Sequence, residues 1–538
     1  MRRRVFLNRA GLAGISSLVV FERAASIRAA AATQVAGKDS TPPSGLSSDT
    51  VRVWHFHDLW RFDQFDSLTL KQGAPRWRPD ATFAEPNIGP LAAWPTVQHD
   101  PNAGRWRMWY SAAWKPLRIM VADSDDGLHW TPVRADHIVP AGKKIAVNHV
   151  FTLPGGSGGS VYVDPTVTDG FQYKLFVHQR GDDVTRIARG DADHRWHDIA
   201  HRRGTTKYLV DDFTLVSKDG LNWNERRDLR WSAQDWHPEP PIFGFYNRHT
   251  NRHVMTVRPG WGDRRQCIQS TQDFRDWSGP ALVMQPDAMD RELIEFYGMP
   301  VFPYGDGYVG LPWVFHPQST EPNRGFNRFV GAVDCQLAFS DDGMRFSRGV
   351  RSTFIGRNAP DEHGGGAIQT SSMVETDDEL RFYSAATRLP HGRGSEARKL
   401  GMTDNASILL HTLRRDGLMR VESSGDWGRF ISRPLVLLSE AIEMNASAPT
   451  GEVLVQLTDI ESRPIEGFTF EDFAVLKHDD QIRFLLSWKN GKLQDLLGKI
   501  IRVEIRMRSS RLFALRGLMH FVDAQDRWLI DDGEPLPM

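Results

Sequence analysis

One short motif recurs along the middle of the chain and constrains the fold more than any other feature. It reads SDDGLHW at residues 124–130, returns as SKDGLNW, STQDFRDW and SDDGMRF, and has a weaker copy, RRDGLMR, around Asp416. Asp-Gly between extended segments predicts a tight hairpin turn, because glycine accepts the positive φ that such turns need. The Trp or Phe that follows is then expected to be the first inward-facing residue of the returning strand.

Each copy of the motif lies a short way after an aromatic extended segment, and another extended run precedes that segment. The aromatic segments are RWRMWYSAA, FQYKLFVHQ, NRHVMTVRP, GYVGLPWVF and ELRFYSAAT. The repeating unit is therefore four strands, with the motif between the third and the fourth. Five such units in a row predict an all-β fold with a five-bladed β-propeller over residues 51–428.

The repeat stops near residue 428, and residues 429–538 follow a different pattern. Ile501, Val503 and Ile505 alternate with Arg502 and Glu504, which predicts a strand with one buried and one solvated face. Several runs of this kind, joined by short polar turns, predict a C-terminal β-sandwich. We expect this domain to pack against the propeller more than to bind carbohydrate by itself.

The N-terminus carries a targeting segment. Residues 1–36 combine a basic start, a short apolar run and an alanine-rich end, which is typical of an export signal and too short for a membrane span. Arg3 and Arg4 resemble the twin-arginine type of signal, with an ordinary secretory signal as the alternative. Residues 37–50 indicate a Pro/Gly/Ser linker. The mature protein is therefore expected to be periplasmic or extracellular, without a membrane partner.

Composition narrows the classes of partner. A formal net charge of -1 gives no long-range attraction for nucleic acid or anionic membranes. Two cysteines, Cys267 and Cys335, make neither a disulfide framework nor a thiolate metal site, so we expect both to be buried. The histidines lack close ligand spacing, so no metal or cofactor is predicted, although a structural calcium or sodium ion is left open. The oligomeric state is not predicted.

The four-stranded units with their Asp-Gly turns resemble the glycoside hydrolases with five-bladed propellers, which include arabinanases and xylosidases of family 43 and invertases of family 32. The resemblance covers residues 50–425, roughly, and a β-sandwich follows the propeller in family 32. It implies hydrolysis of glycosidic bonds in a plant, algal or microbial glycan by a pair of carboxylates at the propeller axis. A carbohydrate-binding propeller without turnover is the alternative. A six-bladed, sialidase-like enzyme is a third option, which would need an arginine cluster.

Asp100 lies in HDPNAGRWRMWY, where the sequence DPN resembles the motif that carries the nucleophile in invertase-like enzymes. Superposing the five units, however, places it with Asp164, Asn247, Asp306 and Asp377, between the first and second strands. Asp and Asn suit such turns because their side chains hydrogen-bond to their own backbone. We therefore predict that Asp100 is a turn residue.

The candidate catalytic carboxylates come from other positions. Glu239, in DWHPEPPIFGFY, precedes the first strand of the third unit, and its Glu-x-Pro resembles the segment with the general acid of family 43. Partial burial there would raise the pKa of a carboxyl, as an acid catalyst needs. The family's first-unit base, an Asp before Pro, is replaced by Trp94-Pro95. Either Glu85 supplies the second carboxylate, or Glu295 does, or the site has lost catalysis.

Polar and aromatic residues fall on the same expected face, at the starts of first strands and between second and third strands. Such side chains bind sugar hydroxyls or stack on sugar rings. The candidates are Trp94, Asn148, His149, Arg258, Trp261, Tyr297, His316, Asp361, His363, Gln369 and His391. The three glycines of DEHGGGAIQT would let the backbone approach a ligand closely.

Overall fold

A computed structural model describes most of the chain after the N-terminal segments. The described residues are 52–84, 94–100, 104–112, 117–136, 138, 146–181, 197–200, 207–232, 238–259, 264–291, 293–320 and 329–534. The expected export signal at 1–36 and the linker at 37–50 lie outside them. No helix among these residues is long and apolar enough to cross a membrane.

Regular structure in the described residues is almost entirely β. The helical segments there are short: α2 (Gly394–Lys399), α3 (Ala524–Asp531) and the 3-10 turns η1 (Pro79–Ala81) and η4 (Leu493–Leu496). The prediction of an all-β fold is confirmed.

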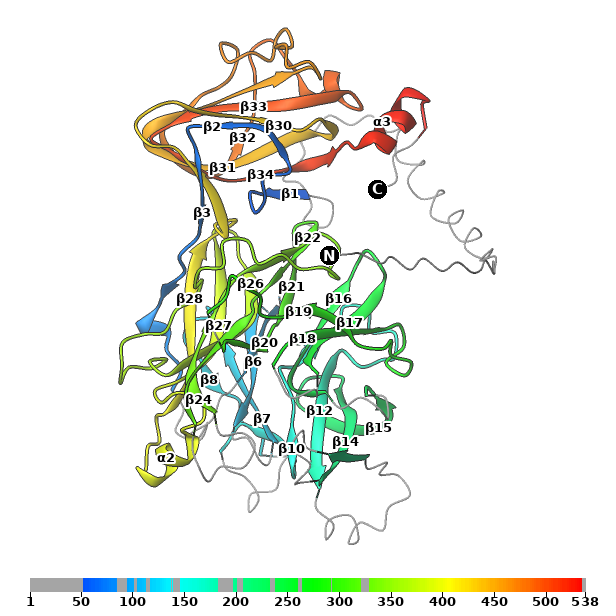
Figure 1. The fold of residues 1–538 in the computed structure, drawn as a ribbon, viewed down its shortest axis with the longest axis vertical. Helices are drawn as coiled ribbons and strands as arrows, with labels where there is room; N and C mark the ends of the chain where they lie inside the picture. The colour runs from blue at the N-terminus through cyan, green and yellow to red at the C-terminus, as the bar shows by residue number, and fades with distance from the viewer. Residues whose placement is uncertain are drawn as a thin grey trace, which may run out of the picture. The chain divides into compact units, whose positions relative to one another are not determined.

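Three of the repeats form separate antiparallel sheets (Figure 1). The first contains β5 (Thr96–Asp100), β6 (Arg105–Ala112), β7 (Leu117–Ser124), β8 (Thr131–Pro132) and β9 (His149–Leu153). The second contains β10 (Gly156–Ser157), β11 (Tyr162–Val163), β12 (Tyr173–Gly181), β13 (His197–Ala200), β14 (Lys207–Ser217) and β15 (Trp223–Arg230). The third contains β16 (Glu239–Asn247), β17 (Arg252–Arg258), β18 (Gln266–Thr271) and β19 (Ala281–Met284). These sheets are the first three blades.

The fourth and fifth repeats do not form separate blades, so the predicted count of five is wrong. The fourth repeat supplies β20 (Glu295–Gly298), β21 (Val301–Tyr304), β22 (Gly307–Gly310), β23 (Trp313–Thr320), β24 (Phe329–Cys335) and β25 (Ala338–Ser340). The fifth supplies β26 (Ala367–Glu375), β27 (Glu379–Thr387) and β28 (Ala406–Arg414), which pairs with β4 (Arg76–Trp77). Parallel pairing of Val333 with Ala367 merges β20, β23 and β24 with the fifth repeat into one seven-stranded sheet. The other strands of the fourth repeat, β21, β22 and β25, form a smaller three-stranded sheet. The described residues thus show four blades of four or more strands, the last of which combines two repeats.

The repeats nevertheless surround one axis. A cavity of about 290 Å³ is lined by the first-strand segments 96–97, 160–163, 243–246, 300–303 and 371–373, one from each repeat. The first and last repeats are neighbours, as a hydrogen bond between them shows: the Ser371 hydroxyl donates to the carbonyl of Pro95 at 2.6 Å. The Tyr383 hydroxyl likewise donates to the carbonyl of Gly127 at 2.8 Å. These contacts close the ring as a propeller requires.

The recurring motif forms the turn that its letters predict. The Ser124 hydroxyl accepts the N–H of Gly127 at 2.9 Å, and Asp126 accepts the N–H groups of Leu128 and His129 at 2.7 and 2.9 Å. Gly127 has a φ of 71°, where a side chain would be strained. The SKDGLNW and SDDGMRF copies repeat the hydrogen bonds and the positive φ.

Asp100 is a turn residue, as predicted. It is the last residue of β5 and lies opposite Arg105, the first residue of β6. It therefore marks the end of a first strand, whereas Glu239 and Glu295 mark the beginnings of β16 and β20.

The remaining strands form a nine-stranded sheet around a second core. They are β1 (Arg52–His55), β2 (Phe62–Asp66), β3 (Thr69–Gln72), β29 (Met419–Glu422), β30 (Gly428–Ser432), β31 (Leu435–Thr458), β32 (Leu476–Leu485), β33 (Ile500–Arg508) and β34 (Arg511–Phe521). The long strand β31 pairs with β34 over most of its first half and with β33 over its second half. This exchange of partners lets one hydrogen-bonded sheet form the predicted sandwich.

The sheet differs from the prediction in two respects. Strands β1 to β3 and β29 belong to it although the sequence predicts a propeller over residues 51–428, because Trp54, Phe62 and Val421 are buried in its core. Glu504, expected on a solvated face, is 1% exposed and accepts hydrogen bonds from Arg429 and Gln456. Sequence alternation showed the buried apolar face but not the burial of Glu504 on the opposite face.

Candidate functional site

Two candidate carboxylates begin first strands. Glu239 is the first residue of β16, and Glu295 is the first residue of β20. Glu239 lies directly across from Arg258 in the pairing of β16 with β17, and its Oε2 is 3.4 Å from a guanidinium nitrogen of Arg258. Glu295 accepts a hydrogen bond from Arg264. Each carboxylate therefore has its own arginine.

The ring of Tyr297 connects the two ion pairs. The guanidinium carbon of Arg258 lies 4.6 Å from the centre of this ring, and that of Arg264 lies 5.4 Å from it. Arg258 also donates to the carbonyl of Pro240, and its burial lowers the pKa of its guanidinium. We call Glu239, Arg258, Arg264, Glu295 and Tyr297 the carboxylate cluster. It contains two carboxylates and two guanidinium groups, so its formal charges balance.

His391 packs against this cluster from the fifth repeat. Its ring centre lies 4.6 Å from that of Tyr297 and 5.2 Å from that of Phe315, with steep angles between the ring planes. The carbonyl of His391 accepts the N–H of Gly331, which fixes the segment beside β24. The fifth repeat thus places a titratable imidazole next to the aromatic centre of the cluster.

A buried aromatic layer lies beside the cluster. The ring of Trp313 is 6.2 Å from Trp94, 5.0 Å from Phe243 and 6.5 Å from Tyr297. The indole N–H of Trp94 donates to the side-chain oxygen of Gln369 at 3.0 Å. Trp94, Tyr297 and Gln369, predicted to bind substrate, are therefore packed together and nearly covered. The axial cavity described above is lined by residues other than those of the carboxylate cluster.

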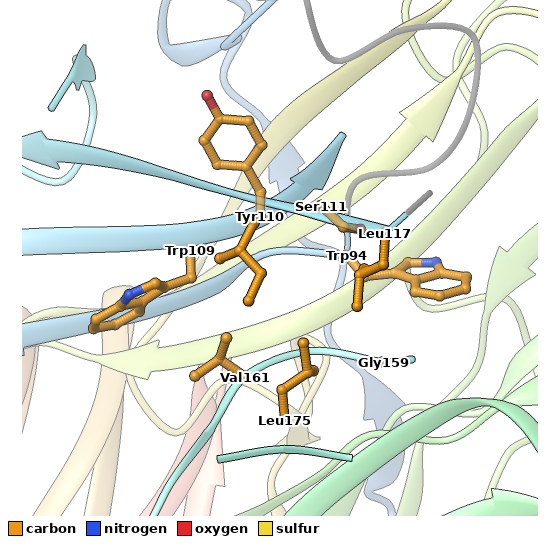
Figure 2. A pocket seen from close by; sticks show the side chains of 9 residues that line it. Trp94, Trp109, Tyr110, Ser111, Leu117, Gly159, Val161 and Leu175 are labelled. Carbon is orange, nitrogen blue, oxygen red and sulfur yellow. The ribbon is translucent and has the colours of Figure 1, made fainter. Parts of the chain in front are cut away.

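A second cavity borders Trp94 on the side of the first two blades (Figure 2). Figure 2 shows Trp109 and Trp94 at its two sides, with Val161 and Leu175 between them. Its volume is about 10 Å³, far below the roughly 300 Å³ at which ligand pockets usually begin. It is a packing cavity and holds no sugar.

The other candidates occupy separate parts of the blades. Asn148 is fully buried and donates to the hydroxyl of Tyr110 at 2.6 Å. His149, also fully buried, has its Nε2 at 2.9 Å from the carbonyl of Phe151 and at 2.7 Å from the hydroxyl of Thr152. These contacts place both side chains within the first blade.

His316 and the loop of the fifth repeat form two further polar groups. His316 lies 3.1 Å from Asp334. Arg388 donates to the carbonyl of Asp361 and lies 3.1 Å from the Nε2 of His363. Burial and the charge of Arg388 lower the pKa of His363. Arg388 therefore holds the loop before β26 in place, whereas His316 and Asp334 connect β23 with β24.

Two glycines of that loop lie against the protein's own backbone. A Cβ on Gly366 would lie 2.1 Å from the carbonyl carbon of Leu389, and one on Gly365 would lie 2.4 Å from the carbonyl oxygen of Ala359. The backbone that approaches them closely is the protein's own.

Two predicted residues, Glu85 and Trp261, lie outside the described residues. In the part of the chain that the structure describes, no three His, Cys, Asp or Glu side chains group as a metal site needs. Cys267 and Cys335 are buried and not disulfide-bonded, as expected. Arg264 was missed by sequence reasoning; its signal is the Arg-Arg pair immediately before β18.

No protein-family model matches the chain, and no curated protein matches it. Solved structures match in part. A family 43 arabinoxylan arabinofuranohydrolase from Bacillus subtilis, in complex with cellotetraose, is 10% identical over 81% of this chain and 98% of that chain, with a TM-score of 0.33. A thermostable family-43 glycoside hydrolase is 12% identical over 63% of this chain and 96% of that chain, with a TM-score of 0.36. An N-acetylgalactosamine deacetylase from F. plautii, in complex with blood group B trisaccharide, is 12% identical over 65% of this chain and 97% of that chain, with a TM-score of 0.38. Scores this low carry no argument, so the proposals below rest on the chain's own geometry.

Proposed function

We propose that the protein is a glycoside hydrolase that cleaves a plant, algal or microbial glycan at the carboxylate cluster. The observation that carries this proposal is the placement of Glu239 and Glu295 at the starts of first strands in neighbouring repeats, joined through two arginines and one tyrosine ring. Glycosidic cleavage needs two carboxyl groups on either side of the scissile bond.

We assign the general acid to Glu239 and the second role to Glu295. The Glu239 side chain is 38% exposed and the Glu295 side chain 19%. Glu239 therefore has the better access to a leaving-group oxygen, which an acid must reach. Glu295 is more enclosed and accepts a hydrogen bond from Arg264, which fixes its position as a nucleophile or general base requires. Glu85 stays an alternative partner for Glu239.

The test compares wild type, Glu239→Gln and Glu295→Gln on aryl glycosides with good and poor leaving groups and on polysaccharides. Loss of a general acid slows substrates with poor leaving groups by about 10²-fold or more, but it spares dinitrophenyl glycosides, whose leaving groups need no proton. Loss of the nucleophile or base slows both kinds. Glu461→Gln, in an exposed ion pair of the sandwich, is the matched control. Full activity of Glu239→Gln on poor leaving groups would refute the assignment.

Carbohydrate binding without turnover is the second candidate, and one observation favours it. Both carboxylates are engaged by arginines, and the aromatic residues beside them are buried. Glycan binding by wild type and both variants, without release of reducing sugar by any of them, would support this function. The sialidase-like option is weaker, because Arg258 and Arg264 face Tyr297 but each already pairs with a glutamate.

A further inference from the structure

Alternate side chains of strand β1 contact the core of the nine-stranded sheet and the propeller. Trp54 faces the core of the nine-stranded sheet, where its ring lies 5.8 Å from that of Phe430. His55 faces the propeller, where its ring stacks on Tyr304 with 4.8 Å between ring centres. The N–H of Val53 donates to Asp306 at 3.4 Å on the same side. Four residues of backbone pairing with β34 complete the attachment.

The imidazole of His55 is buried without a partner for its nitrogens. The residue is 8% exposed, and neither Nδ1 nor Nε2 has a hydrogen-bond partner within the described residues. A cavity of about 20 Å³ borders it, lined among others by Tyr304 and Asp306. That volume admits about one water molecule. Burial lowers the pKa of His55 to about 3.

The charges around His55 do not offset the cost of burying a positive charge on its ring. Arg516, His57 and Arg61 disfavour a positive charge on the ring, while Asp416 favours it. The carboxylate of Asp416, however, already forms an ion pair with the guanidinium of Arg516. The titratable and charged groups that face this region are His57, Arg61, Tyr304, Asp306, Asp341, Glu375, Asp416 and Arg516. A protonated His55 is therefore more stable where water can reach it.

We propose that β1 is an acid-released strap, which detaches from Tyr304 when His55 takes up a proton. In the detached state the imidazole is solvated and titrates near its ordinary pKa of about 6.5. Proton uptake then couples to release, and between pH 6 and 4 each unit of acidification favours the detached state about tenfold. Acid thus loosens the connection between the N-terminal strand and the fourth repeat before it unfolds the propeller.

Hydrogen exchange of residues 52–57 in the full chain tests this proposal, with rates corrected for the pH dependence of intrinsic exchange. In wild type, the opening constant of these amides should rise about tenfold per pH unit between pH 6 and 4. His55→Phe keeps a ring against Tyr304 and removes the titration, so its opening constant should not change with pH. His55→Gln provides a second non-titrating variant.

His411→Phe is the matched control. His411 is also buried, with its pKa lowered to about 4, but it lies in β28 of the fifth repeat. The proposal predicts that this variant keeps the steep pH dependence of residues 52–57. A pH-independent opening constant in wild type would overturn the proposal. So would an unchanged slope in both His55 variants, or a slope that His411→Phe abolishes.

Discussion

Arg516 and Asp416 form a two-pronged ion pair in the interior of the molecule. The Nε of Arg516 donates to Oδ2 of Asp416 at 2.9 Å, and its Nη2 donates to Oδ1. Asp416 also accepts hydrogen bonds from the hydroxyl of Tyr304 at 2.8 Å and the amide of Asn445 at 3.0 Å. Such pairs combine charge with fixed geometry. The pair therefore links the last Asp-Gly turn of the repeats to strand β34 of the nine-stranded sheet.

Replacing Asp416 by Asn should destabilise the protein strongly. The change leaves the Arg516 guanidinium buried without its main counter-charge, which costs about 3 kcal/mol or more. Urea unfolding of wild type and variant measures the loss. Asp480→Asn is the control, because Asp480 pairs with Arg414 but its side chain is 52% exposed; its cost should stay under about 1 kcal/mol. Equal costs for the two variants would contradict the assigned role of burial.

The same pair should make the free energy of unfolding depend on pH in the range where Asp416 takes up a proton. Burial by itself would raise the pKa of Asp416, but the hydrogen bonds and charge of Arg516 outweigh it and lower the pKa to about 2. The folded pKa lies below the unfolded value of about 3.9, so the stabilisation is complete above pH 4 and is lost as the pH falls toward 2. Its size is about 2–3 kcal/mol.

Urea midpoints of wild type and Asp416→Asn between pH 6 and 2 test this dependence. The free-energy difference between the two proteins should be constant above pH 5 and should shrink below pH 4. A difference that stays constant down to pH 2 would show that Asp416 is not held as a carboxylate.

Asp416 also shows what the repeat motif can and cannot predict. The first copy forms its turn from hydrogen bonds within six residues, so the letters SDDGLHW are sufficient to predict it. The fifth copy has the same Asp-Gly, but Asp416 itself has a φ of 61° and its carboxylate turns to Arg516. A partner one hundred residues away leaves no local signal, because only the folded chain brings it near.

Some features of the candidate site could likewise be predicted from the sequence, and others could not. Strand periodicity correctly placed Glu239 and Glu295 at the starts of first strands. It did not show that Arg264 binds Glu295, since that pair depends on how β18 and β20 pack. The fusion of two repeats through Val333 and Ala367 escaped prediction for the same reason. Parallel pairing between distant strands has no sequence pattern of its own.

Gly159→Ala should disrupt the packing between the second and third blades and destabilise the protein. A Cβ on Gly159 would lie 1.5 Å from the carbonyl oxygen of Ile242 in β16, and backbone atoms cannot yield as a flexible side chain does. We expect a loss of about 3 kcal/mol or more, at or beyond the usual range of overpacking. Thermal and urea unfolding measure it. Gly279→Ala, with nothing within 4 Å of its Cβ, should change stability by under about 1 kcal/mol. A tolerated Gly159→Ala would refute this close packing of the blades.

Lys174→Met should destabilise the second blade. The Lys174 ammonium is fully buried and donates to Asp164 at 2.8 Å and to Asp169 at 2.9 Å. Without it, the fully buried Asp164 loses its counter-charge, which costs about 3–5 kcal/mol. Asp169→Asn, which keeps the Lys174–Asp164 pair, should cost clearly less. Urea unfolding compares the two, and the reverse order would contradict the pairing.

The last prediction concerns the pair Arg264 and Glu295 in the carboxylate cluster. Their side chains are 14% and 19% exposed, so each single change to Gln leaves a largely desolvated charge without its partner. Each should cost about 1–3 kcal/mol, and the double variant should cost less than the sum by about 1 kcal/mol or more. Unfolding free energies of the four proteins give this coupling. The cycle of Arg345 and Asp342, where Arg345 is 93% exposed, should give a coupling of about 0–0.5 kcal/mol. A coupling near zero for Arg264 and Glu295 would mean that Arg264 does not hold the carboxylate to which we assign the second catalytic role.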